Sequence, residues 1–115
     1  MKVLVTAVLL TLMLAVGALA QAVTHNAKLI WVDTQNPTGT TYSIYRATGL
    51  CSGTPVFSKL ATGVAVLTYT DTTVTPGNYC YQVTAVAGGV ESAPSNSVLA
   101  PVPSFPPQTL SVVVQ

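Results

Sequence analysis

Beyond about residue 20, apolar and polar positions alternate along the chain with a period of two rather than 3.6. The clearest run covers residues 78–86, whose two faces are Tyr79, Tyr81, Val83 and Ala85 against Cys80, Gln82 and Thr84. No stretch keeps apolar residues at helical spacing over three turns, and Thr, Val and Tyr, which favour strands, are abundant. The pattern therefore predicts β-strands and no helix in this part of the chain.

Turn-forming residues divide the same part of the chain into short segments. Gly, Pro, Asn and Ser recur between the runs, as in Asn36-Pro37, Thr62-Gly63 and Pro76-Gly77. The predicted strands cover residues 27–33, 41–46, 56–60, 67–70, 78–86 and 95–100, with a weak opening strand near 22–25. Short strands with one buried and one solvated face predict an all-β fold, a two-sheet antiparallel β-sandwich of about seven strands.

The alternation also predicts which side chains fill the space between the sheets. The expected core is Leu29, Trp31, Tyr42, Ile44, Tyr79, Tyr81 and Val83. Tyr45 falls on the opposite face of its strand, where two roles stay open: its ring could stack on a ligand such as a sugar, or pack as a cross-strand neighbour, which is the more common role of an exposed strand tyrosine.

Residues 1–20 have the features of a secretory signal. Lys2 precedes an uncharged apolar run, and Ala18-Leu19-Ala20 gives the small-x-small pattern that a signal peptidase cleaves. An uncleaved membrane anchor is the alternative, since the run is just long enough to span a bilayer. We assign 1–20 to a signal peptide, 21–103 to one domain, and 104–115 to a proline-rich linker with an apolar tail. Cleavage leaves no membrane span.

Charge argues against several classes of partner. The chain has four Lys and Arg residues against three Asp and Glu residues, and only 6% of its residues are charged. No basic patch is available to grip phosphate, so nucleic-acid binding is disfavoured. Such a weakly charged surface tolerates self-association and suits a secreted, cell-surface or periplasmic protein.

The two cysteines, Cys51 and Cys80, are an even pair in a chain with an export signal, which favours a disulfide. Two free thiols are the alternative and would fit a reducing compartment. A bridge would close a loop of roughly 30 residues and stabilise the fold by about 3–4 kcal/mol. Because Cys80 falls on the outer face of its strand, we expect the bridge to lie on the surface.

Prolines follow the last predicted strand at positions 101, 103, 106 and 107. Since proline cannot donate a ladder hydrogen bond, we expect the sandwich to end near Ala100. Beyond the prolines, residues 110–114 form an apolar, uncharged segment that has no partner left in the domain. Three interpretations stay open: a frayed tail, the first strand of a further domain, or a strand that pairs with another copy in a homo-oligomer through residues 108–115.

Candidate chemistry is scarce. One histidine, His25, cannot build a histidine-based metal site, and the carboxylates are limited to Asp33, Asp71 and Glu91. Asp71 is expected to cap the turn that follows it by accepting backbone amides. No nucleophile elbow, phosphate-binding loop or Cys-x-x-Cys motif is present. The sequence therefore predicts no catalytic residues, no metal and no cofactor.

Five segments together resemble a known family: Leu29-x-Trp31, 42–46, 69–72, 77–86 and 91–96. In this order and at this spacing they resemble the fibronectin type III domain, and most of all its bacterial and phage versions in secreted proteins. The resemblance covers about residues 22–103. It implies that Trp31 is the core tryptophan of the second strand and that Tyr79 forms a tyrosine corner, its hydroxyl bonding backbone at the preceding turn. The cysteine pair and the lack of an Arg-Gly-Asp loop depart from the usual pattern.

Three functions follow as hypotheses. The first is a non-catalytic extracellular binding or spacer module that contacts a protein or polysaccharide surface partner. The second is a self-assembling structural subunit that uses the C-terminal segment. The third is a carbohydrate-binding accessory domain with Tyr45 in its contact surface. The fold by itself does not decide between them.

Overall fold

The computed structural model describes residues 24–115. The predicted signal peptide and the first half of the weak opening strand lie outside these residues, and residues 24–26 precede the first strand without belonging to one. Within the described part of the chain, no helix is long and apolar enough to cross a membrane. Residues 25–104 form one compact unit, and the strands belong to it.

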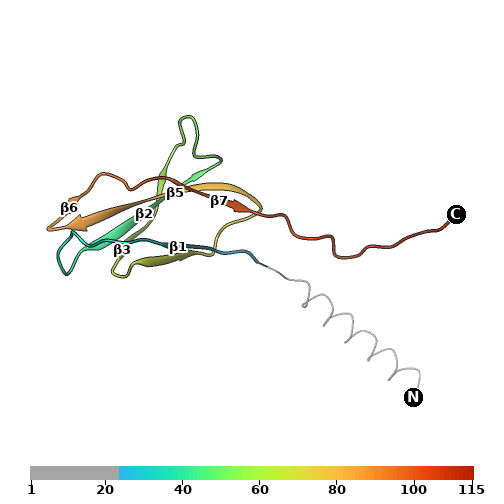
Figure 1. Cartoon of the computed structure of the whole chain (residues 1–115), viewed down its shortest axis with the longest axis horizontal. Coiled ribbons are helices and arrows are strands. Elements are labelled where there is room, and N and C mark those ends of the chain that lie inside the picture. Colours follow the sequence, from blue (N-terminus) through green and yellow to red (C-terminus); the bar gives the residue numbers. More distant parts are fainter. Residues whose placement is uncertain (1–23) are drawn as a thin grey trace, which may run out of the picture. The chain divides into compact units, whose positions relative to one another are not determined.

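Seven strands build the sandwich in two antiparallel sheets (Figure 1). They are β1 (Ala27–Ile30), β2 (Thr41–Thr48), β3 (Ser58–Val64), β4 (Thr68–Asp71), β5 (Gly77–Ala87), β6 (Val90–Glu91) and β7 (Val98–Val102). The small sheet is β1–β4. The large sheet runs β3–β2–β5, and β6 and β7 both pair with the remaining edge of β5. The prediction of an all-β antiparallel sandwich is confirmed.

The core lies between the two sheets where the sequence alternation places it. Ile44 on β2 and Tyr79 and Tyr81 on β5 are buried, together with Val74 from the loop between β4 and β5. Leu29, Trp31 and Val83 are half-buried and pack against this cluster, while Tyr42 is 7% exposed. Val74 was not expected in the core, because it stands in a turn region with no strand periodicity.

The first strand is shorter than predicted, ending at Ile30 rather than at residue 33. The cause is Asp33. Its Oδ1 accepts the backbone N–H groups of Gln35 and Asn36, each at 3.1 Å, which turns the chain away from the sheet. Trp31 continues one step of the pairing, because its N–H donates to the carbonyl of Leu67 at 3.1 Å.

The predicted bounds of the third strand were also wrong. We predicted residues 56–60 and a turn at Thr62-Gly63, but β3 begins at Ser58 and continues through Gly63 to Val64. The register with β2 shifts between Tyr42 and Ile44, and Gly63 has a φ of 69°. Gly63 therefore supports a β-bulge inside the strand, which only a residue tolerant of positive φ does without strain.

The sandwich does not end at Ala100, because β7 passes through Pro101 to Val102. Pro101 lies opposite Asn78, whose carbonyl accepts from Gly49 on the other side of β5. Alternate residues of a strand direct their backbone groups to opposite edges, so this pair exchanges no ladder bond and the missing N–H costs nothing. β7 also begins later than predicted, at residue 98 instead of 95.

The alternation predicted that the outer face of the large sheet is exposed to solvent, but part of this face is buried. Four small side chains on this face are buried: Ser43, Ala47, Cys80 and Thr84. The hydroxyls of Ser43 and Thr62 share a hydrogen bond of 3.0 Å, and the Thr84 hydroxyl donates to Glu91 at 3.1 Å. Their neighbours on the outer face therefore cover them.

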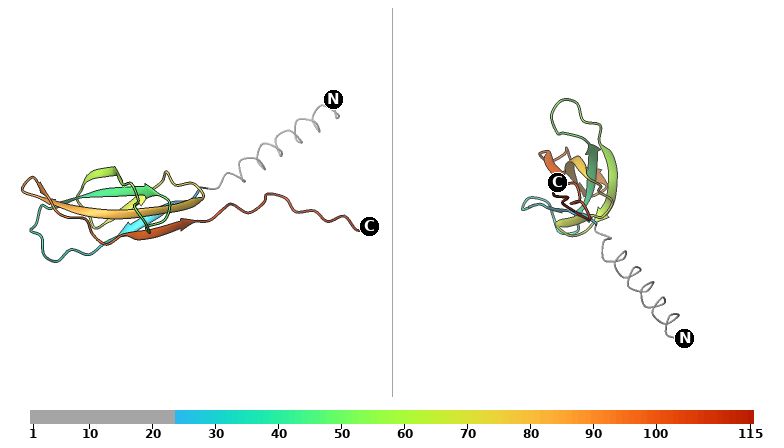
Figure 2. Two further views of the ribbon diagram at one scale, coloured as in Figure 1. Left: turned by 90° about the horizontal axis from the view of Figure 1, so that it is seen from above. Right: turned by 90° about the vertical axis from the view of Figure 1, so that its right-hand side faces the viewer.

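β1 begins and β7 ends at the same end of the sandwich (Figure 2). The pairings fix this arrangement. Val102 lies opposite Gly77 at the start of β5, and Ala27 lies opposite Asp71 just before the loop that leads into β5. β1 and β7 therefore run in opposite directions.

Candidate functional site

The two sheets are joined by a cluster of polar side chains around Asp71, the last residue of β4. Its Oδ2 accepts from Arg46 Nη1 at 2.8 Å and from the Tyr81 hydroxyl at 2.7 Å. Its Oδ1 accepts from the N–H and hydroxyl of Thr73 at 2.9 and 2.6 Å. The carboxylate is 1% exposed, so these bonds replace the water it would otherwise bind.

These contacts set the charge state of the cluster. Burial opposes ionisation of Asp71, but the hydrogen bonds from Thr73, Tyr81 and Arg46 outweigh it and lower its pKa to about 2. Burial and the bond to the carboxylate raise the pKa of Tyr81. At neutral pH the Asp71 carboxylate is therefore ionised, and it accepts hydrogen bonds from the protonated Tyr81 phenol and the Arg46 guanidinium. These charge states suit a structural contact between the sheets and not a site of proton transfer.

Tyr79 lies beside this cluster. Its hydroxyl accepts the backbone N–H of Thr75 at 3.1 Å and shares a bond of 3.0 Å with the Thr75 hydroxyl. This is the geometry that the resemblance implied for a tyrosine corner. The Arg46 guanidinium carbon lies 5.1 Å from the centre of the Tyr79 ring, within range of a cation–π contact.

Asp33 is engaged in the same way at the other end of the sandwich. Besides the two amides of its own turn, it accepts from the Asn36 side chain and from the Tyr42 hydroxyl, both at 2.7 Å. The bond from Tyr42 is the main reason that the pKa of Asp33 lies far below its ordinary value. Asp33 thus ties the loop after β1 to the start of β2.

Tyr45 and Glu91 form a pair on the outer face of the large sheet. The Tyr45 hydroxyl donates to the two carboxylate oxygens of Glu91 at 2.7 and 3.0 Å. This bond is the main cause that lowers the pKa of Glu91. Lys59 Nζ lies 5.6 Å from the centre of the Tyr45 ring and 3.8 Å from Glu91. Tyr45 is half-buried, and the side chains of Glu91 and Lys59 lie against it, so its ring is not fully exposed to solvent.

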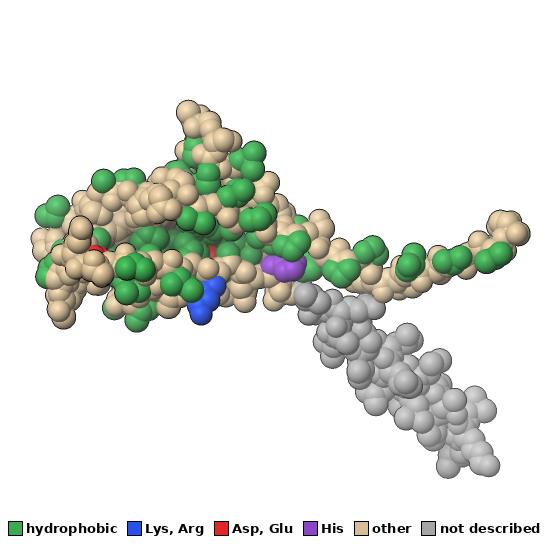
Figure 3. All heavy atoms as spheres, in the orientation of Figure 1, with side chains coloured by type: hydrophobic (Ala, Val, Ile, Leu, Met, Phe, Trp, Pro, Cys, Tyr) green, Lys and Arg blue, Asp and Glu red, His purple; other side chains and the backbone are tan. Residues whose placement is uncertain are grey.

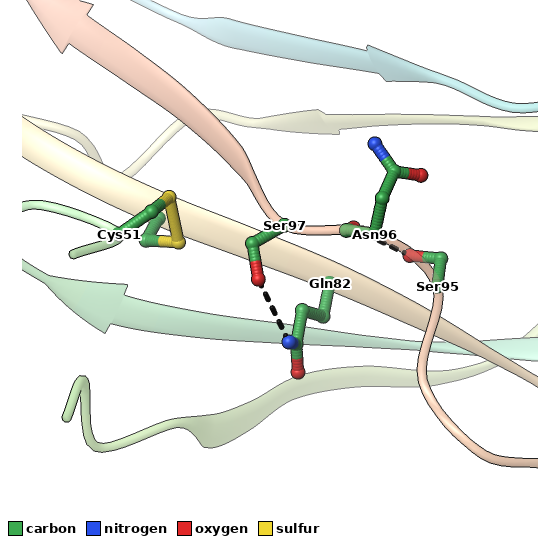
Figure 4. Close-up of a disulfide and its surroundings, with 6 residues drawn as sticks. Cys51, Gln82, Ser95, Asn96 and Ser97 are labelled. Atoms are coloured by element: carbon green, nitrogen blue, oxygen red, sulfur yellow. Dashed lines mark hydrogen bonds between the residues drawn. A yellow bond between two sulfur atoms is a disulfide. The ribbon is translucent and has the colours of Figure 1, made fainter. Parts of the chain in front are cut away.

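Cys51 and Cys80 form a disulfide, with Cα atoms 5.2 Å apart (Figure 4). The bridge ties the loop after β2 to β5, next to the backbone bond from Gly49 N–H to the Asn78 carbonyl. The prediction of a surface bridge is wrong for Cys80, which is fully buried, although Cys51 is half-buried. Small neighbours on the outer face leave room for the loop to cover the sulfur.

Two serines in the 91–96 segment complete the edge of β5 between β6 and β7. Ser92 N–H donates to the Ala85 carbonyl, while its Oγ accepts the Ala85 N–H at 2.9 Å. Ser95 does the same with Val83, at 2.8 and 3.0 Å. The Gln82 side chain adds a bond to Ser97 at 2.8 Å (Figure 4). Hydroxyl groups here take the place of strand carbonyls, which the sequence pattern alone did not reveal.

An apolar groove of about 640 Å³ opens between the two sheets. Its walls are β1 with Trp31 and Val32 on one side, and β5, β7 and residues 95–96 on the other. Figure 3 shows apolar side chains in the hollow between the two layers. The inward side chains include Leu29, Trp31, Val83, Val98 and Ala100. The alternation along single strands does not predict this groove, because its walls belong to different sheets.

The three carboxylates of the chain, for which the sequence predicted no catalytic role, lie in separate parts of the molecule. Asp33, Asp71 and Glu91 each have their own partners, and no two of them share one. Among residues 24–115, no group of three or more His, Cys, Asp or Glu side chains is placed to hold a metal. Asp71 was expected in a turn, but its hydrogen bonds from Arg46 and Tyr81 were not expected, because these residues lie 25 and 10 positions away along the chain.

Comparison with curated proteins gives one partial match. The chain is 51% identical over 67 residues to an amylopullulanase of Thermoanaerobacter thermohydrosulfuricus. The match covers 56% of this chain but only 4% of that protein, so the chain corresponds to a small segment of it. No family model matches the sequence.

Solved structures give a fuller match. An Fn3-like protein from Clostridium thermocellum is 32% identical with a TM-score of 0.57, and the match covers 70% of this chain and 80% of that one. A second match is the fibronectin type III domain of human fibronectin type III domain containing protein 3, which is 20% identical with a TM-score of 0.57. This match covers 73% of this chain and 78% of that domain. A further human FNIII domain is 21% identical with a TM-score of 0.56, over 71% of this chain and 69% of its own. The two human domains support the fold. The bacterial structure is 32% identical and is matched over 80% of its own length, which shows that this chain belongs to the fibronectin type III family.

Proposed function

We propose that this protein is a non-catalytic binding or spacer module that works outside the cytosol. The observation that carries the proposal is the use of all three carboxylates of the chain in structural hydrogen bonds. A hydrolytic site needs an acid and a base that face a shared substrate. Asp33 and Asp71 instead hold loops and sheets together, and Glu91 is bonded to Tyr45.

The location rests on two features. A disulfide persists in oxidising compartments, which favours the cell surface, the periplasm or the medium over the cytosol. The signal-like pattern of residues 1–20 points the same way. A fusion of residues 1–20 to a reporter that is active only after export tests this part, and retention of the reporter in the cytosol would contradict it.

The catalytic part of the proposal is tested with purified protein and substrates of three classes: polysaccharides, peptides and esters. We expect no turnover above the buffer rate. Glu91→Gln provides the matched control, since Glu91 is exposed and its loss leaves the core intact. A rate that exceeds the buffer rate and falls in Glu91→Gln would overturn the proposal.

A second candidate function is binding to a glucan, which the likeness to a segment of an amylopullulanase favours. The contact surface would be the group of Tyr45, Lys59 and Glu91 on the outer face, in which the Tyr45 ring is half-buried. Electrophoresis through gels that contain pullulan or amylopectin measures it directly. Retardation should be retained in Tyr45→Phe, which keeps the ring, and lost in Tyr45→Ala. Equal mobility with and without glucan would exclude this role.

A further inference from the structure

The two sheets of the sandwich are unequal, and the small sheet has an open edge. β1 pairs with β4, and no strand of residues 24–115 pairs with its other edge. Trp31 N–H and the Leu29 carbonyl both bond toward β4. Because alternate residues direct their backbone groups to opposite edges, Lys28 and Ile30 present theirs at the open edge. An edge of this kind is a template for an added strand.

The apolar groove lies along this open edge. No residue of β4 lines it, whereas β1 forms one wall and β5 with β7 forms the other. A third strand next to β1 would therefore project its inward side chains into the groove and cover the part of the large sheet that two strands leave exposed. Ile30 and Val98, which border the groove, are 73% and 55% exposed.

The chain carries a segment that fits this position. Residues 110–114 read Leu-Ser-Val-Val-Val, contain no charge and belong to no strand. Leu110, Val112 and Val114 share one face and are 89%, 79% and 90% exposed. We propose that residues 110–114 of one copy add to the open edge of β1 in a second copy, antiparallel to β1, with these three side chains in the groove.

The direction of the strands explains why the acceptor is a second copy. A strand antiparallel to β1 runs in the direction of β7 and must start at the far end of β1, near Ile30. The chain leaves β7 at the opposite end, beside Ala27. Residues 103–109 join β7 to this segment and reach at most about 25 Å when extended. Three of them are proline, whose fixed φ disfavours a tight reversal followed by a return along the domain. In a second copy placed ahead of the first, the same segment enters without reversal.

Such pairing is heterologous, because the donor segment and the acceptor edge are different surfaces. Each copy that donates its tail still has a free groove, and each copy that accepts a tail still has a free tail. Contacts of this kind extend into open chains unless a rotation closes them into a ring. The partner is thus another molecule of this protein, and its surface is distinct from that around Tyr45.

The test uses the processed protein, residues 21–115, and two tail variants, Val112→Asp and Val113→Asp. The wild-type residues are equally exposed, at 79% and 78%, but only Val112 points into the groove in the proposed arrangement. Sedimentation velocity over a range of concentrations should show oligomers that grow with concentration for the wild type and for Val113→Asp. Val112→Asp should weaken association at least tenfold, because it would bury an unpaired carboxylate.

Trp31 gives a second readout, since it is the single tryptophan of the chain and lines the groove. A synthetic peptide of residues 108–115, titrated into Val112→Asp protein, should shift the Trp31 emission to shorter wavelength. The peptide with the Val112→Asp change should leave the emission unaltered. A wild-type protein that is monomeric at every concentration would overturn the proposal. So would equal association of the two variants, or binding of the tail to β1 of its own chain.

Discussion

Arg46 Nη1 of β2 lies 2.8 Å from Asp71 Oδ2 of β4, and this ion pair links the large sheet to the small one. The Arg46 side chain is 25% exposed and that of Asp71 is 1% exposed, so the pair lies at the border of the core. The carboxylate gains three further hydrogen bonds from Tyr81 and Thr73, and these offset the cost of its burial. The pair therefore depends on its surroundings as much as on its own attraction.

Removal of the Asp71 carboxylate should destabilise the protein strongly. Asp71→Ala leaves Arg46 and Tyr81 without their acceptor, and we expect a loss of about 3–5 kcal/mol in the free energy of unfolding. Chemical denaturation in urea measures it. Lys59→Ala is the matched control, because its pairing with Glu91 at 3.8 Å is exposed and should contribute less than about 1 kcal/mol. Similar losses in the two variants would contradict the role given to Asp71.

Stability should fall at low pH because of the same carboxylate. The folded protein lowers the pKa of Asp71 from 3.8 to about 2. A lowered pKa stabilises the fold at every pH above about 4, and this contribution of about 2 kcal/mol disappears as the pH falls from about 4 to 2. Urea unfolding at pH 2 and pH 6 measures the difference. It should become smaller in Asp71→Asn without vanishing, since the pKa of Asp33 and that of Glu91 are lowered too.

The disulfide should make a separate contribution. It closes a loop with a sequence separation of 29 residues, which corresponds to about 3–4 kcal/mol of unfolded-state entropy. The double variant Cys51→Ala/Cys80→Ala should lose this amount in urea unfolding, together with some packing at the buried Cys80. Reduction of the wild type with a thiol in denaturant should reproduce most of the loss. A double variant as stable as the oxidised protein would show that the bridge does not support the fold.

The hydroxyl of Tyr79 should be worth about 1–2 kcal/mol. Tyr79→Phe retains the ring but leaves the Thr75 N–H without its acceptor at 3.1 Å. Tyr69→Phe is the control, because Tyr69 packs against the same core. Within residues 24–115 the Tyr69 hydroxyl has no counterpart of the hydrogen bonds that link the Tyr79 hydroxyl to Thr75. Thermal unfolding followed by circular dichroism compares the two. A loss in Tyr69→Phe as large as that in Tyr79→Phe would argue against a specific role of the corner.

Local periodicity was sufficient to predict the fold class and the inner face of β5, because both depend on alternation within a single strand. It was insufficient wherever a side chain changed the course of the backbone. β1 ends early because Asp33 forms a turn, and Gly63 lies in a β-bulge where a turn was predicted. Pro101 lies inside β7, where the strand was expected to have ended. Asp33 acted through the amides of its own turn, whereas the outcomes at Gly63 and Pro101 depended on the neighbouring strand, which the local sequence does not specify.

The polar clusters were harder to predict for a related reason. Asp71 was correctly expected to accept the amide of Thr73, since that contact is two residues away. Its bonds with Arg46 and Tyr81 join three strands, and Tyr45 meets Glu91 across 46 residues. Prediction of such pairs requires the register of the sheet, which depends on the bulge and on the turn lengths. For the same reason, the buried outer face around Cys80 could not be inferred from alternation.

The common end of β1 and β7 has a mechanical consequence for a protein held by its two termini. A pulling force applied at Ala27 and Val102 acts on two different sheets at the same end of the sandwich, so it separates the sheets from that end and breaks their contacts one after another. The isolated domain would therefore yield at low force. A strand held along the open edge of β1 would be pulled parallel to its length, so that all of its hydrogen bonds resist together.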